Sequence, residues 1–216
     1  MMNIAKLIWS TPNAEQLLAD IARVSAPDRQ GMEPTGLIRF LMRNKHWSPF
    51  EMVSMCVEIN TTRTVSRQIL RHRSFSFQEF SGRWSPMTEL SAASTPVCRL
   101  QNPSDRAQPL SDVPAEVDAW WRTRARALQI EAEEAYRAAL GKGIAREVAR
   151  SVLPEGLTPT RLYMAGTFRS WLHYLQLRLK PDTQLEHRDV AKAIQHQFVK
   201  VAPITWAAGK EELSCC

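Results

Sequence analysis

Residues 71–83 read Arg-His-Arg-Ser-Phe-Ser-Phe-Gln-Glu-Phe-Ser-Gly-Arg. Three arginines and one histidine supply strong hydrogen-bond donors within these thirteen residues, and three phenylalanine rings lie between them. A guanidinium group can hold a phosphate or a carboxylate through two parallel hydrogen bonds. Such donors beside aromatic rings suit a ligand that has both a phosphate and a flat heterocycle. The stretch therefore predicts binding of a nucleotide or a flavin.

The pattern around this stretch predicts a short helix that leads into an extended segment. We expect the helix over residues 64–71, and period-two alternation becomes plausible from Arg73 onward. In an extended chain, alternate side chains point to the same side. Glu79, Ser81 and Arg83 would then face one way and form a polar wall.

The rest of the chain predicts mainly helices with one small sheet. Apolar residues alternate with polar ones over residues 53–59, which is typical of a half-buried strand. Residues 85–114 are rich in Pro, Ser, Thr and Asn and predict a long surface excursion. Helical spacing predicts helices over 14–25, 35–44, 116–140, 144–152, 160–179 and 189–201. Separate helix and strand blocks favour an α+β fold, mainly helical with one central antiparallel sheet.

Composition predicts one soluble domain over residues 1–216. A hydrophobic fraction of 44% and a charged fraction of 23% are ordinary for a globular protein of 216 residues. No apolar run of about 18 residues occurs, so no membrane partner is expected. The N-terminal residues lack the pattern of a signal peptide, which predicts a cytoplasmic location. The four cysteines have no metal-ligand spacing, so no metal is expected.

The net charge of +6 and a pI of about 9.4 favour anionic ligands. The basic residues are mostly arginines interspersed with glutamates rather than one lysine-rich run. Mixed signs indicate pockets and solvated faces more than a surface that tracks a duplex. A basic nucleic-acid-binding module remains an alternative, in which arginines would follow phosphates and Phe77 would stack on a base. The favoured interpretation has no nucleic-acid partner.

The spacing within residues 71–83 resembles the signature of the flavin-dependent thymidylate synthases, the ThyX family. That signature is Arg-His-Arg, seven arbitrary residues and Ser, which here are Arg71, His72, Arg73 and Ser81. The resemblance implies that the three basic residues contact FAD and that Arg71 also lies near the substrate phosphate. It further implies that Ser81, Gly82 and Arg83 line the phosphate and sugar of dUMP.

Two other residues near the signature take their roles from the same resemblance. Gln68 matches a position that binds dUMP. Glu79 is expected to steer an arginine or ribose hydroxyls, and we assign it to both the flavin and the nucleotide. Ser81 has no neighbouring base that would make it a nucleophile, so a hydrogen bond to the nucleotide is the better interpretation.

Two further segments resemble family motifs. The first, His46-Trp47-Ser48-Pro49-Phe50-Glu51, is similar to His-x-Ser/Thr-Pro-Phe-Glu-His, with Met52 in place of the last histidine. Within it, Ser48 matches a residue that contacts FAD. The second is the run Arg-Glu-x-x-Arg-x-x-Leu-Pro over residues 146–154, in which Arg150 matches an arginine that binds dUMP.

A fourth segment lies in the helix predicted over residues 160–179. Arg178 matches the arginine that the family uses to polarise the uracil ring, and it is the predicted catalytic residue. Arg169 and His173 match flavin contacts. Thr167 matches a further flavin contact, where it replaces the usual asparagine, and a hydroxyl group can supply only part of the hydrogen bonding of an amide. Without the resemblance, Trp171 and Tyr174 would be assigned to the core.

The four segments occur in the family's order, and the resemblance covers residues 14–205. It implies reductive methylation of dUMP to dTMP, with 5,10-methylenetetrahydrofolate as carbon donor and NADPH as reductant of the FAD. It also implies a homotetramer whose active sites are built from several chains. No Gly-x-Gly-x-x-Gly fingerprint occurs, so FAD must be held in another way. A flavoprotein that acts on another nucleotide remains a second alternative.

Overall fold

The computed structural model describes residues 4–90 and 95–213, with side chains up to residue 210. Its centre is a four-stranded antiparallel sheet in the order β1-β2-β4-β3. The strands are β1 (Ala5–Ser10), β2 (Ser54–Thr62), β3 (Ser76–Glu79) and β4 (Pro159–Thr167). The two central strands pair along their whole length, from Ser54 opposite Thr167 to Thr62 opposite Pro159. The predicted mixture of helices with one antiparallel sheet is confirmed.

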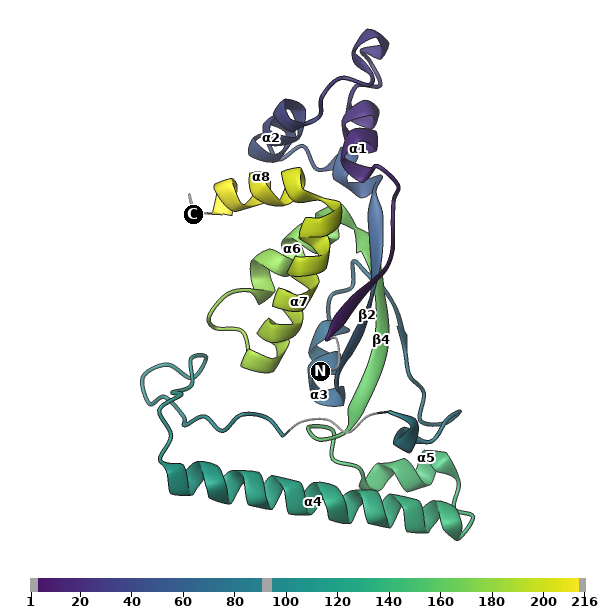
Figure 1. Ribbon diagram of the computed structural model, residues 1–216, viewed down its shortest axis with the longest axis vertical. Coiled ribbons are helices and arrows are strands. Elements are labelled where there is room, and N and C mark those ends of the chain that lie inside the picture. The colour runs from purple at the N-terminus through teal and green to yellow at the C-terminus, as the bar shows by residue number, and fades with distance from the viewer. Residues whose placement is uncertain (1–3, 91–94, 214–216) are drawn as a thin grey trace.

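One face of the sheet carries the main core. Alternate residues of β2, among them Met55, Val57 and Ile59, are fully buried. They pack beneath helices α6 (Phe168–Arg178) and α7 (Leu185–Val201), which lie on the same side of the sheet (Figure 1). The indole of Trp171 in α6 donates a hydrogen bond to the carbonyl oxygen of Met55 at 3.2 Å. This contact fixes α6 against β2.

Most of the remaining helices lie at the two ends of the sheet (Figure 1). At one end are α1 (Ala14–Ala22), α2 (Thr35–Arg43) and α8 (Pro203–Leu213), and beside β2 lies α3 (Arg63–Ile69). At the other end are the long α4 (Ala115–Gly141) and the short α5 (Arg146–Ala149). There Met87, Tyr136 and Ala149 form a second, small core. Single 3₁₀ turns occupy Pro27–Arg29, Ser48–Glu51, Met87–Glu89 and Arg150–Val152.

The prediction of one helix over residues 160–179 is wrong. Its first half is strand β4, and α6 starts at Phe168. Thr160, Leu162 and Met164 are buried while the residues between them are more exposed, which is the period of a strand. Thr167 is the N-cap of α6, and its hydroxyl accepts a hydrogen bond from the backbone N–H of Ser170. This strand-to-helix change places Thr167 at the start of α6 and not within the predicted helix.

The other predicted elements are confirmed with shifted ends. The helix predicted over 189–201 begins four residues earlier, at Leu185, and the one over 144–152 is α5 followed by a 3₁₀ turn. Strand β1 and helix α8 have no counterpart among the predicted elements. The excursion over 85–114 contains one 3₁₀ turn and a bridge between Leu100 and Leu110, and its residues 91–94 lie outside the described part of the chain.

The predicted polar wall after the signature does not form. Strand β3 ends at Glu79, and the chain then turns, with the N–H of Trp84 donating to the carbonyl oxygen of Ser81 at 3.0 Å. The side chains of Glu79 and Arg83 therefore face different surroundings. Within residues 4–90 and 95–213, no helix is long and apolar enough to cross a membrane, and no cluster of three or more His, Cys, Asp or Glu side chains could hold a metal ion.

Candidate active site

The first half of the signature, residues 71–75, is held against α6 by packing and one hydrogen bond. Phe75 is buried, and its ring meets that of Trp171 edge to face with centroids 4.6 Å apart. A Cβ atom on Gly166 in β4 would lie 2.4 Å from the Phe75 ring, so the ring sits directly on the backbone of the strand. The hydroxyl of Ser170 donates to the carbonyl oxygen of Ser74 at 3.3 Å. The basic signature residues are thereby fixed beside the fourth motif.

Arg178 and His72 meet at the end of α6. The Nε–H of Arg178 donates to Nε2 of His72 at 2.9 Å. Burial, with a contribution from the positive charge of Arg178, lowers the pKa of His72 from 6.5 to about 4. His72 is therefore neutral at neutral pH and accepts this hydrogen bond. The contact uses only Nε of the Arg178 guanidinium, so its two terminal nitrogens can face a ligand.

Gln68 joins the same cluster through a histidine that the sequence analysis did not select. Nδ1 of the fully buried His187 lies 3.1 Å from Oε1 of Gln68. The opposite ring nitrogen lies 3.1 Å from the hydroxyl of Tyr174, whose ring packs edge to face on His72. Burial, followed by the charges of Arg178 and His72, lowers the pKa of His187 to about 3. Burial raises the pKa of Tyr174, so both groups are neutral.

The motif around Ser48 packs on the outer side of α6. Glu51 forms an ion pair with Arg169, and the ring of Trp47 meets that of His173 with centroids 5.0 Å apart. Burial lowers the pKa of His173, with a smaller contribution from Arg169. Ser48 is exposed at the start of the same 3₁₀ turn as Glu51. The predicted flavin contacts at positions 48, 169 and 173 thus come together.

Three predicted flavin residues differ in how many of their polar groups are free to bind a ligand. The exposed guanidinium groups of Arg71 and Arg73 have no ion-pair partner among the described residues. Unpaired cations within the signature fit a cofactor that carries a pyrophosphate. Thr167 is different, because its hydroxyl accepts from the N–H of Ser170 and also donates to the Ser170 hydroxyl. Its local capping role leaves little for a ligand.

The second half of the signature packs against α5. A Cβ atom on Gly82 would lie 2.8 Å from Sδ of Met87 and 3.5 Å from Cδ of Arg150, so only glycine fits without displacing a neighbour. Arg83 forms an ion pair with Glu147 at 3.1 Å. Ser81 accepts a hydrogen bond from the Arg83 N–H at 3.4 Å. The predicted dUMP residues 81, 82, 83 and 150 therefore form one group.

Glu79 lies between the two halves and is tied into the sheet. Its Oε1 accepts hydrogen bonds from the hydroxyls of Ser66 and Thr160 at 2.7 and 2.8 Å. Its Oε2 lies 4.0 Å from Arg63. Glu79 therefore has a structural role in this chain, and only Oε2 retains capacity for a ligand.

Within one chain, most of the predicted site residues fall into two separate groups. The α6 group contains Ser48, Gln68, His72, Arg169, His173 and Arg178, and the α5 group contains Ser81, Gly82, Arg83 and Arg150. Figure 1 shows α5 beside α4 at one end of the molecule, well away from α6 and α7. The structure of a single chain thus brings the residues together within each group and not between them.

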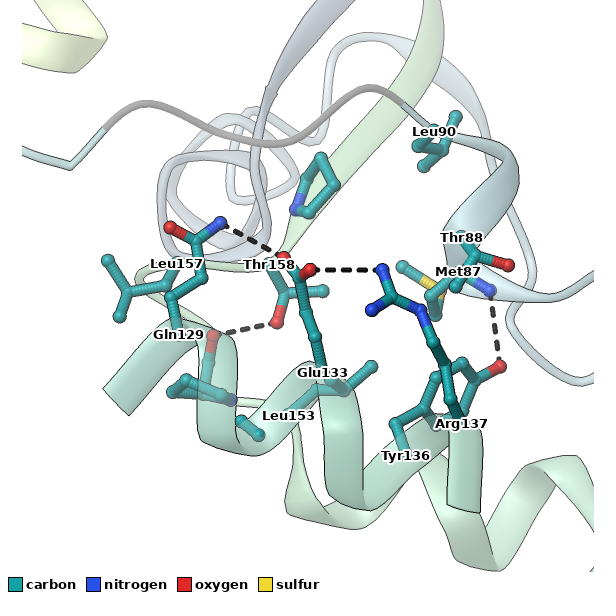
Figure 2. A pocket seen from close by; sticks show the side chains of 13 residues that line it. Met87, Thr88, Leu90, Gln129, Glu133, Tyr136, Arg137, Leu153, Leu157 and Thr158 are labelled. Atoms are coloured by element: carbon teal, nitrogen blue, oxygen red, sulfur yellow. Dashed lines mark hydrogen bonds and ion pairs between the residues drawn. The ribbon is translucent and has the colours of Figure 1, made fainter. Parts of the chain in front are cut away.

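A cavity of about 120 Å³ lies between α4 and the Met87–Glu89 turn (Figure 2). Gln129, Glu133 and Arg137 enter it from α4, and Gln129 donates to Glu133 at 3.2 Å. Tyr136 closes one side, where its hydroxyl accepts from the N–H of Met87 at 3.1 Å. None of the predicted site residues lines this cavity. The polar groups at its wall are largely satisfied by one another, so it is not the candidate active site.

The fold is shared with a nucleotide methylase. It is similar to the UMP/dUMP methylase PolB from Streptomyces cacaoi in its structure bound with 5-Br dUMP, with a TM-score of 0.81, 30% identity, and coverage of 96% of this chain and 94% of that one. The family model "Thymidylate synthase complementing protein" matches residues 6–204. This chain belongs to the flavin-dependent thymidylate synthases.

Two relatives support that assignment over most of their length. A probable flavin-dependent thymidylate synthase from Paramecium bursaria Chlorella virus 1 is 44% identical over 88% of each chain. The flavin-dependent thymidylate synthase of Synechocystis sp. is 45% identical over 90% of this chain and 88% of its own. The family predicted from the signature is confirmed, and with it the prediction of a flavin-dependent methyltransferase.

Several residues that shape the site received no role from the sequence. They are Trp47, Glu51, Gln184, Glu186 and His187. His187 follows Gln184 and Glu186 at the start of α7, and such a cluster of polar residues at the start of an amphipathic helix was the available signal. Its burial depends on packing between α6 and α7, which no local pattern shows.

Proposed function

We propose that this enzyme converts dUMP to dTMP, with 5,10-methylenetetrahydrofolate as carbon donor and NADPH as reductant. In the balanced reaction the folate gives up its one-carbon unit, and NADPH and a proton supply the two hydrogens that complete the methyl group and release tetrahydrofolate. The observation that carries the proposal is the hydrogen bond between Arg178 and His72, because it joins the predicted uracil-polarising arginine to the signature. When bound, FAD would carry the hydride from NADPH.

Arg178 is the residue that we expect to act on the pyrimidine. Its guanidinium is aimed by the neutral imidazole of His72 and does not need to reorient when negative charge develops on the ring. Preorganised donors of this kind stabilise transition-state charge more than water does. Gln68, near the end of α3, would hold the same nucleotide from that helix.

Binding of the nucleotide phosphate would use the α5 group. Arg83 and Arg150 supply guanidinium groups beside Gly82, whose missing side chain lets Met87 and Arg150 pack directly on its backbone. Ser81, Glu79 and Arg71 would complete the dUMP contacts. FAD would be held by Ser48, Arg71, His72, Arg73, Glu79, Arg169 and His173, with Thr167 at the margin.

A homotetramer with shared active sites would unite the two groups. The described helices leave much of one face of the sheet open (Figure 1), and Trp9 of β1 and Tyr163 of β4 are exposed large side chains on strands of that sheet. Tyr163 donates to Glu58 at 2.9 Å between adjacent strands. We expect another subunit to cover this face, and we expect the assembly to bring Arg178 of one chain opposite the α5 group of another. Residues 1–216 would act as one domain within that assembly.

The test starts with the purified protein. It should be yellow with the absorbance of an oxidised flavin, and it should release tritium from dUMP labelled at the carbon that receives the methyl group. Release should require the folate, and NADPH should bleach the flavin. A colourless protein whose affinity for nucleic acid falls steeply with salt would contradict the proposal and favour the nucleic-acid-binding alternative.

UMP is the second candidate substrate. A structural neighbour is the same Streptomyces cacaoi methylase bound with 5-Br UMP, with a TM-score of 0.83 and 30% identity. Comparison of dUMP, UMP and dCMP in the tritium assay decides between them. Preference for dUMP is expected, and equal turnover of UMP would broaden the function to methylation of both uridine monophosphates.

A further inference from the structure

Gln68 is the start of a hydrogen-bonded chain that leads to the 85–114 excursion. Its Nε2 donates to Oε1 of Gln184 at 2.6 Å, and Nε2 of Gln184 donates to Oε2 of Glu186 at 2.8 Å. Arg99 pairs with both oxygens of that carboxylate, each at 2.9 Å. The Arg99 and Glu186 side chains are only 17% and 23% exposed, so the pair is largely shielded from water. Arg99 thus anchors the excursion to the start of α7.

The chain continues on the other side of the Gln68 amide. Oε1 of Gln68 faces Nδ1 of His187, and Nε2 of His187 faces the Tyr174 hydroxyl. Both histidine contacts are buried or half-buried, so solvent cannot replace them freely. Five side chains between Glu186 and Tyr174, ends included, form one continuous path.

The direction of every hydrogen bond in this path follows from the carboxylate at its end. Burial raises the pKa of Glu186, but the hydrogen bonds from Arg99 and Gln184 outweigh burial and lower it overall. An ionised carboxylate only accepts, so Gln184 must present its NH₂ group to Glu186 and its oxygen to Gln68. Gln68 must then present its NH₂ group to Gln184 and its oxygen to His187.

The same logic sets the tautomer of His187. Because Oε1 of Gln68 accepts, Nδ1 of His187 carries the proton, and the bare Nε2 accepts from the Tyr174 hydroxyl. A protonated imidazole would put a second donor against that hydroxyl and a second positive charge near Arg178. The low pKa of His187 is consistent with the neutral ring that this arrangement requires.

We propose that Glu186, acting through Gln184, and His187 are positioning residues that hold the Gln68 amide in one orientation for the nucleotide. The inference rests on the proposed function, in which Gln68 contacts dUMP. These contacts use one N–H and one lone pair of Gln68, so the second N–H and the second lone pair have fixed directions before the nucleotide arrives. Such preorganisation removes part of the ordering cost of binding. The excursion contributes to the site through Arg99.

A charge swap separates positioning from mere structural support. In the double variant Arg99→Glu with Glu186→Arg, the ion pair between positions 99 and 186 persists. Position 186 now donates hydrogen bonds instead of accepting them, so Gln184 must present its oxygen to it and every hydrogen bond in the path changes direction. Gln68 should then turn its NH₂ group toward His187, which should move its proton to Nε2. We expect the swap to recover thermal stability lost in either single variant and yet to bind dUMP roughly tenfold more weakly than wild type.

Two measurements on the FAD-loaded enzyme give the outcome. Calorimetric titration measures the affinity for dUMP. The ¹⁵N chemical shifts of the imidazole nitrogens report the tautomer of His187, and the His187→Gln variant identifies which signal belongs to this residue. Wild type should show His187 protonated at Nδ1. A swap of the exposed pair Asp189 and Lys192 on the same helix, 3.3 Å apart, is the matched control and should leave both readouts unchanged.

The results distinguish this inference from the proposed function. Weakened dUMP binding in Gln68→Ala together with wild-type affinity in the charge swap would overturn the positioning role alone. Unchanged affinity in Gln68→Ala would remove Gln68 from the nucleotide site. The positioning role of Glu186 and His187 would then be overturned as well. Should the swap not fold, Glu186→Gln provides the test, because an amide at 186 permits either orientation. Wild-type affinity in that variant, or Nε2 protonation of His187 in wild type, would also overturn the inference.

Discussion

His72 and Arg178 show how a single contact can set both charge and direction. The half-buried imidazole of His72 accepts from the Arg178 Nε–H, and burial followed by the charge of Arg178 lowers its pKa to about 4. Any protonation of His72 would place two cations 2.9 Å apart and turn Arg178 away. The signature histidine is thus suited to orient the arginine at neutral pH, apart from any contact that it makes with FAD.

Replacement of Arg178 by alanine should separate chemistry from cofactor binding. We expect Arg178→Ala to retain bound flavin, because Arg71 and Arg73 remain, while turnover falls by roughly 100-fold or more, the usual loss when one preorganised charge donor is removed. Flavin absorbance and tritium release measure the two effects. Lys180→Ala changes an exposed cation two residues away and should behave as wild type. Normal turnover in Arg178→Ala would refute its catalytic assignment.

His187 predicts a specific loss of stability in acid. Its pKa is 6.5 in the unfolded chain and about 3 in the folded protein, so protons bind the unfolded state more tightly. The stabilisation is fully present above pH 6.5 and is lost as the pH falls toward 3. Urea unfolding between about pH 7 and 5 should give wild type a slope up to ~1.4 kcal/mol per pH unit steeper than His187→Gln. The exposed His46→Gln variant is the control, and equal slopes for wild type and His187→Gln would contradict the prediction.

At the scale of elements, local patterns predicted most helices and one strand but not the change from β4 to α6. Residues 171, 174 and 178 have helical spacing, and extending that spacing backward predicts one long helix. The alternation of Thr160, Leu162 and Met164 is the better signal, since these residues are buried and pair with β2. A strand of this length gains its stability from nine paired positions on β2, which a single segment of sequence does not show.

The contact between Phe75 and Gly166 couples β4 to the signature. A methyl group at position 166 would meet the buried Phe75 ring at 2.4 Å, and the ring cannot move without disturbing Trp171. We expect Gly166→Ala to destabilise the protein by about 1–3 kcal/mol and to weaken flavin binding, because overpacking displaces the signature. Thermal unfolding and flavin titration measure these effects.

The control for this substitution uses another glycine. Gly36 in α2 has open space where an alanine methyl group would lie, so Gly36→Ala should be neutral or stabilising by up to ~1 kcal/mol. If Gly166→Ala unfolds at the same temperature as wild type, the close packing at position 166 does not constrain the signature.

At the scale of the whole molecule, the ordered motifs predicted the family and indicated candidate site residues. They did not predict that these residues separate into an α6 group and an α5 group within one chain. The sequence places Gly82 shortly after His72, yet the turn after β3 directs it toward α5 while His72 faces α6. Conversely, Arg178 is 106 residues from His72 and contacts it directly. Long-range packing of α6 on the sheet decides both where Gly82 lies relative to His72 and that Arg178 contacts His72. The spacing of residues within the motifs does not reveal this packing.

Mixed oligomers provide a direct test of shared active sites. Arg178→Ala lacks the arginine of the α6 group and Arg150→Ala lacks one of the α5 group, so each variant alone should be nearly inactive. If a site takes Arg178 from one subunit and Arg150 from another, some sites in a mixed oligomer contain both native arginines. Random pairing of equal amounts should restore up to about a quarter of wild-type activity.

Co-expression of the two variants with different affinity tags isolates the mixed species, and its tritium release from dUMP gives the restored activity. Reassembled Arg178→Ala alone is the control, because every site in it lacks the same guanidinium group. Mixed oligomers with no restored activity would mean that both arginines of each site come from the same chain. The two groups would then have to be joined by a movement of α5 toward α6, since α5 lies at one end of the subunit, away from α6 (Figure 1).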